Sequence, residues 1–102
     1  MIAESVELTP NVFESIIGER FLVGNDHESE DRIELTLVEA VRSPRGHPGR
    51  LEPFSLIFEG AAEMPLNQGT YLFTHPEIGT PPIFIVPVSQ DQFVRRYQAI
   101  FN

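Results

Sequence analysis

Short apolar segments separated by glycine and proline clusters follow one another after residue 20, and this spacing restricts the fold more than any other feature. Ile33, Leu35 and Leu37 alternate with more polar neighbours, which is the period of a half-buried strand. The segments lie at 21–23, 33–38, 54–58, 70–75, 83–86 and 96–101. This pattern predicts an all-β fold, a small antiparallel β-sandwich or a partly open β-barrel of five to seven strands.

Two features near the end of the chain refine this prediction. Pro87 has no backbone N–H to donate, so we expect an edge or a bulge at the end of the segment 83–88. The chain is apolar up to Phe101, so we expect its last residues to form a docked strand.

One short helix is predicted before the strands, over about residues 10–17. Thr9 is suited to cap it and Pro10 to occupy its first position, while Gly18 supplies a stop. The apolar residues of this segment share one face; they are Val12, Phe13, Ile16 and Ile17. A helix of two turns is unstable alone, so we expect this face to be docked on the sheet within a single domain spanning 1–102.

Size and composition exclude several classes of protein. A chain of 102 residues suits one domain, and its hydrophobic share of 41% is that of a globular protein. No apolar run approaches the ~18 residues of a membrane-spanning helix, and the acidic start MIAESVEL does not resemble an export signal. We therefore expect a cytoplasmic protein. The absence of cysteine excludes disulfides and thiolate chemistry.

The net charge of −8 is concentrated in the first part of the chain. Residues 1–40 carry ten acids against two arginines, whereas residues 41–102 carry five acids and five arginines. A surface of this sign repels phosphate groups, so neither nucleic acid nor an anionic membrane is an expected partner. The charge is explained by solubility or, alternatively, by a basic protein partner.

The best candidate for a metal site is the acidic segment 25–31, in which Asp26, His27 and Glu28 are consecutive. Hard cations need several oxygen ligands at close range, and this segment holds four carboxylates. It lacks the glycine and the terminal acid of a calcium-binding loop. A solvated hairpin loop is therefore the main alternative, and these three residues remain weak candidates.

Other catalytic signatures are absent. No serine lies in a Gly-x-Ser-x-Gly turn, and the stretch from Gly46 to Gly49 lacks the lysine of a phosphate-binding loop. His27, His47 and His75 fall in separate turn-rich segments. We expect His75 to hold its own turn closed by donating to a backbone carbonyl. The sequence thus predicts no catalytic residue, no cofactor and no enzymatic activity.

Arginines supply the candidate interaction residues. Arg42, Arg45 and Arg50 flank or occupy the turn-rich segment 43–50 and form the one basic cluster in the sequence. Arginine often anchors protein interfaces through its planar guanidinium, although ordinary solvated surface charge is the simpler explanation of the cluster. Arg95 and Arg96 are expected to pair with the acidic N-terminal segment and to help dock the helix.

A series of motifs extends over nearly the whole chain, at 54–60, 65–71, 75–79, 83–88 and 97–102. Together with Leu8, Thr9 and Phe13, they resemble a family of short bacterial proteins with no assigned function, sometimes encoded beside phage-tail-like collar or fibre proteins. Gly60 is followed here by Ala-Ala-Glu where the family has a glycine–proline pair, which we expect to alter only the loop. The resemblance implies a context of assembly and carries over no catalytic residue.

Three functional hypotheses follow. The first is a non-enzymatic β-domain that acts through protein–protein contacts, as an accessory of a phage-tail-like assembly, with an unidentified protein partner or as a homo-oligomer. The second is a small-ligand-binding barrel whose cavity is lined by Phe73, Phe84, Tyr71 and Tyr97. The third is a weak metal-dependent activity at the segment 25–31.

Overall fold

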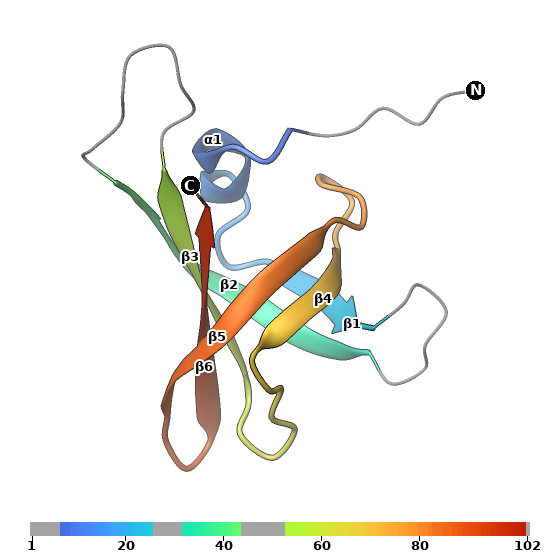
Figure 1. The fold of residues 1–102 in the computed structure, drawn as a ribbon, viewed down its shortest axis with the longest axis vertical. Coiled ribbons are helices and arrows are strands. Elements are labelled where there is room, and N and C mark those ends of the chain that lie inside the picture. Colours follow the sequence, from blue (N-terminus) through green and yellow to red (C-terminus); the bar gives the residue numbers. More distant parts are fainter. Residues whose placement is uncertain (1–6, 26–31, 44–52, 102) are drawn as a thin grey trace.

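The computed structural model describes residues 7–25, 32–43 and 53–101, which form one short helix and six strands. The elements are α1 (Pro10–Glu14), β1 (Arg20–Gly24), β2 (Ile33–Arg42), β3 (Phe54–Ala61), β4 (Gly69–Thr74), β5 (Pro82–Gln90) and β6 (Val94–Phe101). All strand pairs are antiparallel, and the order β1-β2-β3-β6-β5-β4 closes into a barrel (Figure 1). The all-β prediction is confirmed, and the barrel is closed.

Closure comes from the pairing of β1 with β4, the last link in the ring. Val23 lies opposite Phe73, and Leu22 lies opposite Thr74. Bulges interrupt two other pairs, between Leu37 and Glu39 in β2 and between Pro87 and Ser89 in β5. The second bulge is where Pro87 predicted an irregularity. Bulges bend a strand and increase its twist, which helps six short strands curl into a ring.

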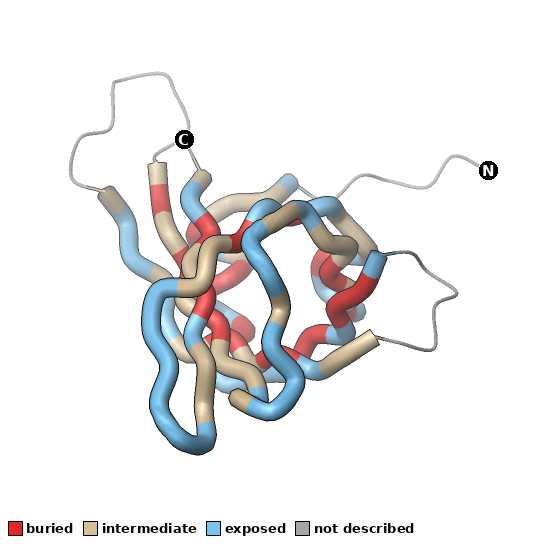
Figure 2. The backbone as a smooth tube through the Cα atoms, turned by 60° about the horizontal axis from the view of Figure 1, so that its bottom comes forward, coloured by how far each residue is buried: buried red, intermediate tan, exposed pale blue. Residues whose placement is uncertain are grey.

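The barrel interior is filled by the inward-facing residues of every strand, coloured red in Figure 2. Three phenylalanines lie at its centre: the Phe21 ring packs 5.4 Å from that of Phe58, and the Phe58 ring packs 4.9 Å from that of Phe73, measured between centroids. All three side chains are fully buried. Edge-on and tilted contacts of this kind add to the energy of burial.

The helix α1 covers one end of the barrel. Thr9 caps it as predicted, accepting a hydrogen bond from the Val12 N–H. Phe13 is fully buried, with its ring 5.8 Å from those of both Phe54 and Phe101. The docked apolar face was therefore predicted correctly, with one exception, since Ile17 is exposed.

The helix is shorter than the predicted span of 10–17. It ends at Glu14, and residues 15–18 form turns. Gly18 has a φ of 94°, a left-handed conformation that glycine adopts without strain. Its N–H donates to the carbonyl of Leu37, and the Leu37 N–H donates to the carbonyl of Glu19. These two backbone hydrogen bonds to β2 stabilise the turn at 15–18, so α1 does not continue through these residues. Within the described part of the chain, no helix has the length and apolarity needed to cross a membrane.

Candidate functional site

The outer wall of the barrel has an unusual composition over β3, β5 and β6. Side chains alternate along each strand, so the neighbours of buried residues point outward. In one row across the wall, Ile57 of β3 pairs with Gln98 of β6, which pairs with Val86 of β5. In the adjacent row, Ser55 of β3 pairs with Ile100 of β6. None of these five residues is charged.

Apolar side chains on neighbouring strands extend these two rows. Val41 of β2 pairs with Ser55. Phe84 lies two residues before Val86 on β5 and shares its outward direction. Val88 lies within the β5 bulge between Pro87 and Ser89, where the alternation is interrupted, and its side chain is exposed. We call the whole set the outer-wall surface; it consists of Val41, Ser55, Ile57, Phe84, Val86, Val88, Gln98 and Ile100.

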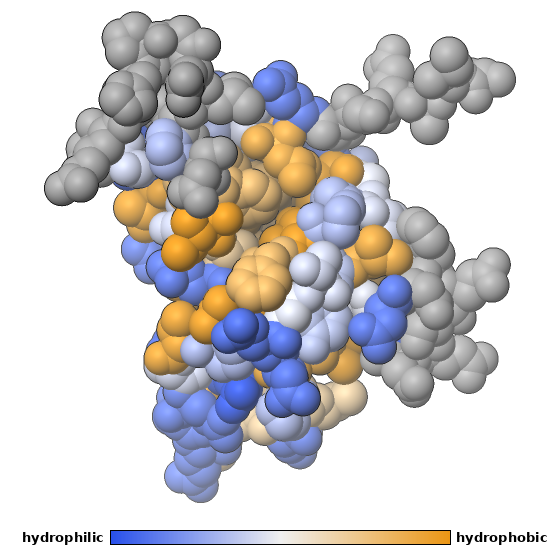
Figure 3. Space-filling model, in the orientation of Figure 1, coloured by the Kyte–Doolittle hydropathy of each residue, from blue (hydrophilic) through white to orange (hydrophobic). Residues whose placement is uncertain are grey.

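Several of these side chains are well exposed to solvent. The exposed fraction is 63% for Ile100, 50% for Phe84, 49% for Val88 and 46% for Val41. Figure 3 shows hydrophobic side chains gathered over the crossing of β5 and β6, whereas hydrophilic side chains cover the hairpin ends below. Single exposed apolar residues are normal on soluble proteins, but a contiguous group marks an interaction site.

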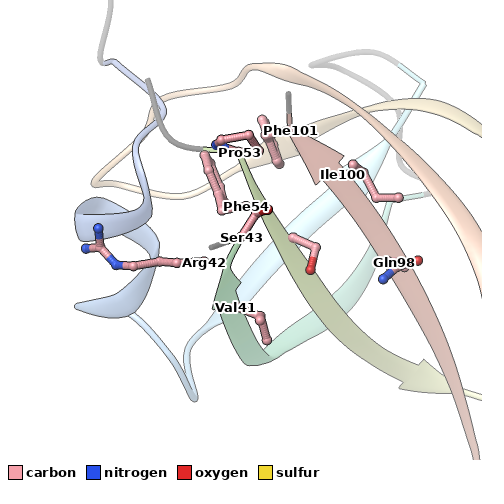
Figure 4. Close-up of a pocket in the computed structure, with 9 residues that line it drawn as sticks. Val41, Arg42, Ser43, Pro53, Phe54, Gln98, Ile100 and Phe101 are labelled. Carbon is pink, nitrogen blue, oxygen red and sulfur yellow. The ribbon is translucent and has the colours of Figure 1, made fainter. Parts of the chain in front are cut away.

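The upper part of the outer-wall surface is hollowed. A shallow depression of about 330 Å³ lies there, lined by Val41, Ser55, Gln98 and Ile100, with Arg42, Ser43, Pro53, Phe54 and Phe101 at its end. The Phe54 and Phe101 rings are stacked, with centroids 4.6 Å apart and planes inclined by 3° (Figure 4). The lining of this depression is chiefly apolar, so it suits a hydrophobic side chain of a partner.

Charged side chains lie at the margins of the surface, and one ion pair is formed there. In the row next to Gln98, Arg96 donates from Nε to Glu59 Oε2 at 2.8 Å, and its Nη2 is also 2.8 Å from that oxygen. Glu39 lies at the opposite margin, where it pairs across the strands with Ile57. An apolar centre with a polar margin is the usual anatomy of a protein interface.

Phe93 provides a useful contrast, since it is the most exposed large apolar residue among those described, at 73%. It lies in the β5–β6 turn, outside the outer-wall surface. Asp91 closes this turn by accepting hydrogen bonds from the Phe93 and Val94 N–H groups, both at 2.8 Å. These bonds lower the pKa of Asp91 below its usual value. Gln92 and Glu63 line the small hollow beside Phe93, so its surroundings are polar and charged.

Of the three predicted interaction arginines, the structure describes Arg42, and it places this residue against the helix. Its Nη2 lies 2.8 Å from Glu14 Oε1, its Nε donates to Glu14 Oε2 at 2.9 Å, and Nη2 also donates to Asn11 Oδ1. The hydrogen bonds from Arg42 lower the pKa of the Glu14 carboxyl. Arg42 therefore helps to dock α1, while Arg45 and Arg50 lie outside the described residues.

The prediction that Arg95 and Arg96 dock the helix is wrong. Arg96 pairs with Glu59 on the neighbouring strand, as the β3–β6 register dictates. Arg95 donates to Gln90 and, at 3.4 Å, to the carbonyl of Leu66. Both arginines are thus held near their own strand, because cross-strand neighbours are closer than the helix at the other end of the barrel.

His75 holds its turn closed, but by a different set of bonds from the one predicted. Its Nδ1 accepts a hydrogen bond from the Glu77 N–H at 3.0 Å, and its Nε2 lies 2.7 Å from Glu19 Oε1. Because Nδ1 accepts, Nε2 carries the hydrogen and donates to the carboxylate. The ring is buried, 4.8 Å from that of Phe21. This histidine joins the β4–β5 turn to the segment before β1.

The weak metal candidates Asp26, His27 and Glu28 lie outside the described residues. Within the ranges 7–25, 32–43 and 53–101, no group of three histidine or acidic residues is arranged to hold a metal ion.

The four aromatic residues proposed to line a ligand cavity do not converge. Phe73 and Tyr97 are fully buried in the core, whereas Phe84 points outward from the wall. The Tyr71 hydroxyl donates to the carbonyl of Asn67 at an exposed position. The inward-facing rings are packed against one another, so no described space is shared by all four.

Residues 8–101 match the family described as a domain of unknown function, DUF6916. The chain belongs to this family. No curated protein and no solved structure matches it. The match spans α1 and all six strands, so the DUF6916 domain corresponds to the complete barrel with its helix.

The outer-wall surface of this DUF6916 domain was not predicted from its sequence. One signal was present, since the run from Ile83 to Val86 is apolar at every position and not only at alternate ones. Such a run places apolar side chains on both sides of a strand. In a barrel, one of those sides faces solvent.

Proposed function

We propose that this barrel is a non-enzymatic domain that acts through protein–protein contacts, and that the outer-wall surface makes them. One observation carries the proposal: on β3, β5 and β6, outward positions of a solvent-facing wall hold isoleucine, valine and phenylalanine without any charged residue between them. Burying this surface against a partner would be favourable by the hydrophobic effect. No inward function requires these residues, because the core is complete without them.

The interior offers no comparable support for ligand binding. Its centre is occupied by the contacting rings of Phe21, Phe58 and Phe73. Small barrels of this kind hold side chains in their interior where wider ones hold a ligand. The wall is therefore the better candidate for function.

The class of partner to examine first follows from the resemblance noted in the sequence. Its context implies collar or fibre proteins of a phage-tail-like assembly, for which this domain would be an accessory. Assembly proteins present apolar surfaces to one another, and an uncharged wall suits that chemistry.

Site-specific photo-crosslinking tests the proposal. A benzophenone amino acid is placed at Gln98, in the middle of the outer-wall surface, and, as a matched control, at Gln92 in the β5–β6 turn. Irradiation in the native host should give protein adducts from position 98 and few from position 92. Introducing Ile100→Asp beside the probe should abolish the adducts, because the carboxylate would have to be buried.

The Ile100→Asp variant is expected to fold normally, since the side chain is largely exposed and lies outside the core. Equal adduct yields from the two positions, or adducts that survive Ile100→Asp, would overturn the proposal.

A further inference from the structure

We infer that the outer-wall surface binds a second copy of this chain, so that two barrels associate wall to wall about a twofold axis. This inference rests on the proposed function and specifies its partner. In a twofold dimer the same patch occurs on both sides of the interface and must be complementary to itself. An uncharged apolar patch meets that requirement, whereas a patch with net charge repels its own copy.

The distribution of charge along the chain supports self-association through this wall. All residues of the outer-wall surface come from the segment 41–102, whose five acids and five arginines cancel. The net charge of −8 resides in residues 1–40, whose described strand and helix residues belong to α1, β1 and β2. A basic partner would be drawn to that acidic part of the molecule, so a neutral apolar partner suits the wall.

One margin of the surface is compatible with a second copy as well. Glu59 and Arg96 form a closed ion pair at one margin, so the wall presents both signs of charge together. Opposed copies therefore do not bring two unpaired like charges together at this margin.

The closed ring also determines what kind of contact is available. Each strand pairs with two neighbours in the order β1-β2-β3-β6-β5-β4, so over most of the ring no sheet edge is free for a partner strand. The end of β6 is an exception among the described residues, since the β5–β6 register ends at Val86 and Gln98 and residues 99–101 pair with β3 alone. Over the rest of the wall, contact with another molecule must be made by side chains. This favours a folded apolar surface over an extended peptide as the occupant.

The size of the surface sets the strength of the dimer. The exposed fractions of Val41, Phe84, Val88 and Ile100 leave roughly 300–400 Å² of apolar side chain open to solvent, against about 800 Å² per partner in a standard interface. We therefore expect the dimer to be weak and reversible. Raising the salt concentration should tighten it, because screening reduces the repulsion between two molecules of charge −8.

Sedimentation velocity over a concentration series tests this inference. The wild-type chain should shift from 11.5 kDa towards twice that mass as its concentration rises. Ile100→Asp should weaken the association at least about tenfold, because each dimer would bury two carboxylates. Phe93→Ser is the matched control: it removes a more exposed apolar side chain outside the surface and should leave the association unchanged.

Disulfide trapping gives a second readout. The chain has no cysteine, so Gln98→Cys introduces a single thiol in the centre of the surface, and Gln92→Cys introduces one outside it. Mild oxidation should convert Gln98→Cys to a covalent dimer several times faster than Gln92→Cys.

A wild-type chain that remains monomeric up to millimolar concentration, with equal trapping rates for the two thiols, would overturn the inference. The proposed function is tested independently of this inference by the crosslinking experiment. Photo-adducts from position 98 with a different protein would preserve it while excluding the second copy as partner. An adduct of twice the chain mass supports both.

Discussion

Replacing Tyr97 by phenylalanine tests how the closed barrel secures the connection between β3 and β4. Tyr97 is fully buried on β6, and its hydroxyl oxygen accepts a hydrogen bond of 2.9 Å from the Leu66 N–H. Leu66 lies in that connection, 31 residues earlier in the chain. The substitution removes one oxygen atom and leaves the ring in place.

The expected loss of stability follows from the Leu66 N–H, which is left without its hydrogen-bond acceptor. A net hydrogen bond contributes about 0.5–1.5 kcal/mol, and an orphaned buried donor costs about 1–3 kcal/mol. Leu66 is only half-buried, so water reaches its N–H in part and the lower end applies. We expect a loss of about 1 kcal/mol, which lowers the melting temperature by roughly 4–8 °C for a domain of this size.

The chain contains a matched control in its other tyrosine. The Tyr71 hydroxyl donates to the carbonyl of Asn67 at an exposed position, where water replaces it readily. Tyr71→Phe should therefore cost less than about 0.5 kcal/mol. Calorimetry on both variants measures the difference, and amide hydrogen exchange should show faster opening at Leu66 in Tyr97→Phe alone.

Equal melting temperatures for the two variants would refute the stabilising role assigned to the Tyr97 hydroxyl. An unchanged exchange rate at Leu66 would refute it as well, since that amide would then not depend on the hydroxyl.

Three further predictions concern the ends of the barrel. Phe13→Ala should cost about 3–5 kcal/mol, because it empties the space between α1 and the barrel end, and chemical denaturation should show that loss. Glu14→Gln should be less stable than wild type at pH 7. Pairing with Arg42 lowers the pKa of the Glu14 carboxyl in the folded state below its ordinary value of 4.5, so the carboxylate stabilises the fold above pH 4.5 and loses this effect as it is protonated. The difference in stability between the two proteins should therefore close as the pH falls below 4.5. Thermal melts from pH 7 to 3 measure this gap, and a constant one would contradict the argument. His75→Ala should cost about 2–3 kcal/mol, since it orphans the Glu77 N–H, whereas Glu19→Gln keeps an acceptor and should cost less in the same melts.

Local pattern in the sequence predicted the elements of the fold because those elements depend on near neighbours. The alternation of Phe54, Leu56 and Phe58 identified an inward face, and all three are buried. Thr9 predicted the start of the helix, and Pro87 predicted an edge or a bulge, of which the structure has the bulge; both residues act through local backbone geometry. Each of these features needs only a few consecutive residues.

Contacts between distant segments were predicted poorly. Arg95 and Arg96 were assigned to the helix, yet Arg42 is the arginine that binds it. Charge identifies which residues attract, but the register of the strands decides which of them meet. Similarly, the aromatic content of β4, β5 and β6 indicated a cavity, whereas the direction of each ring depends on which side of its strand faces inward.

The sequence by itself determined that this chain forms short antiparallel strands and a capped helix, because period-two alternation, capping and proline are local constraints. Only the tertiary structure decided that β1 closes on β4 and that Ile57, Phe84, Val86 and Ile100 lie together on the outer wall. The physical reason is that hydrophobicity identifies side chains that prefer burial without specifying what buries them. Those facing inward are covered by the barrel itself, whereas those facing outward on this wall are the ones for which we propose a partner.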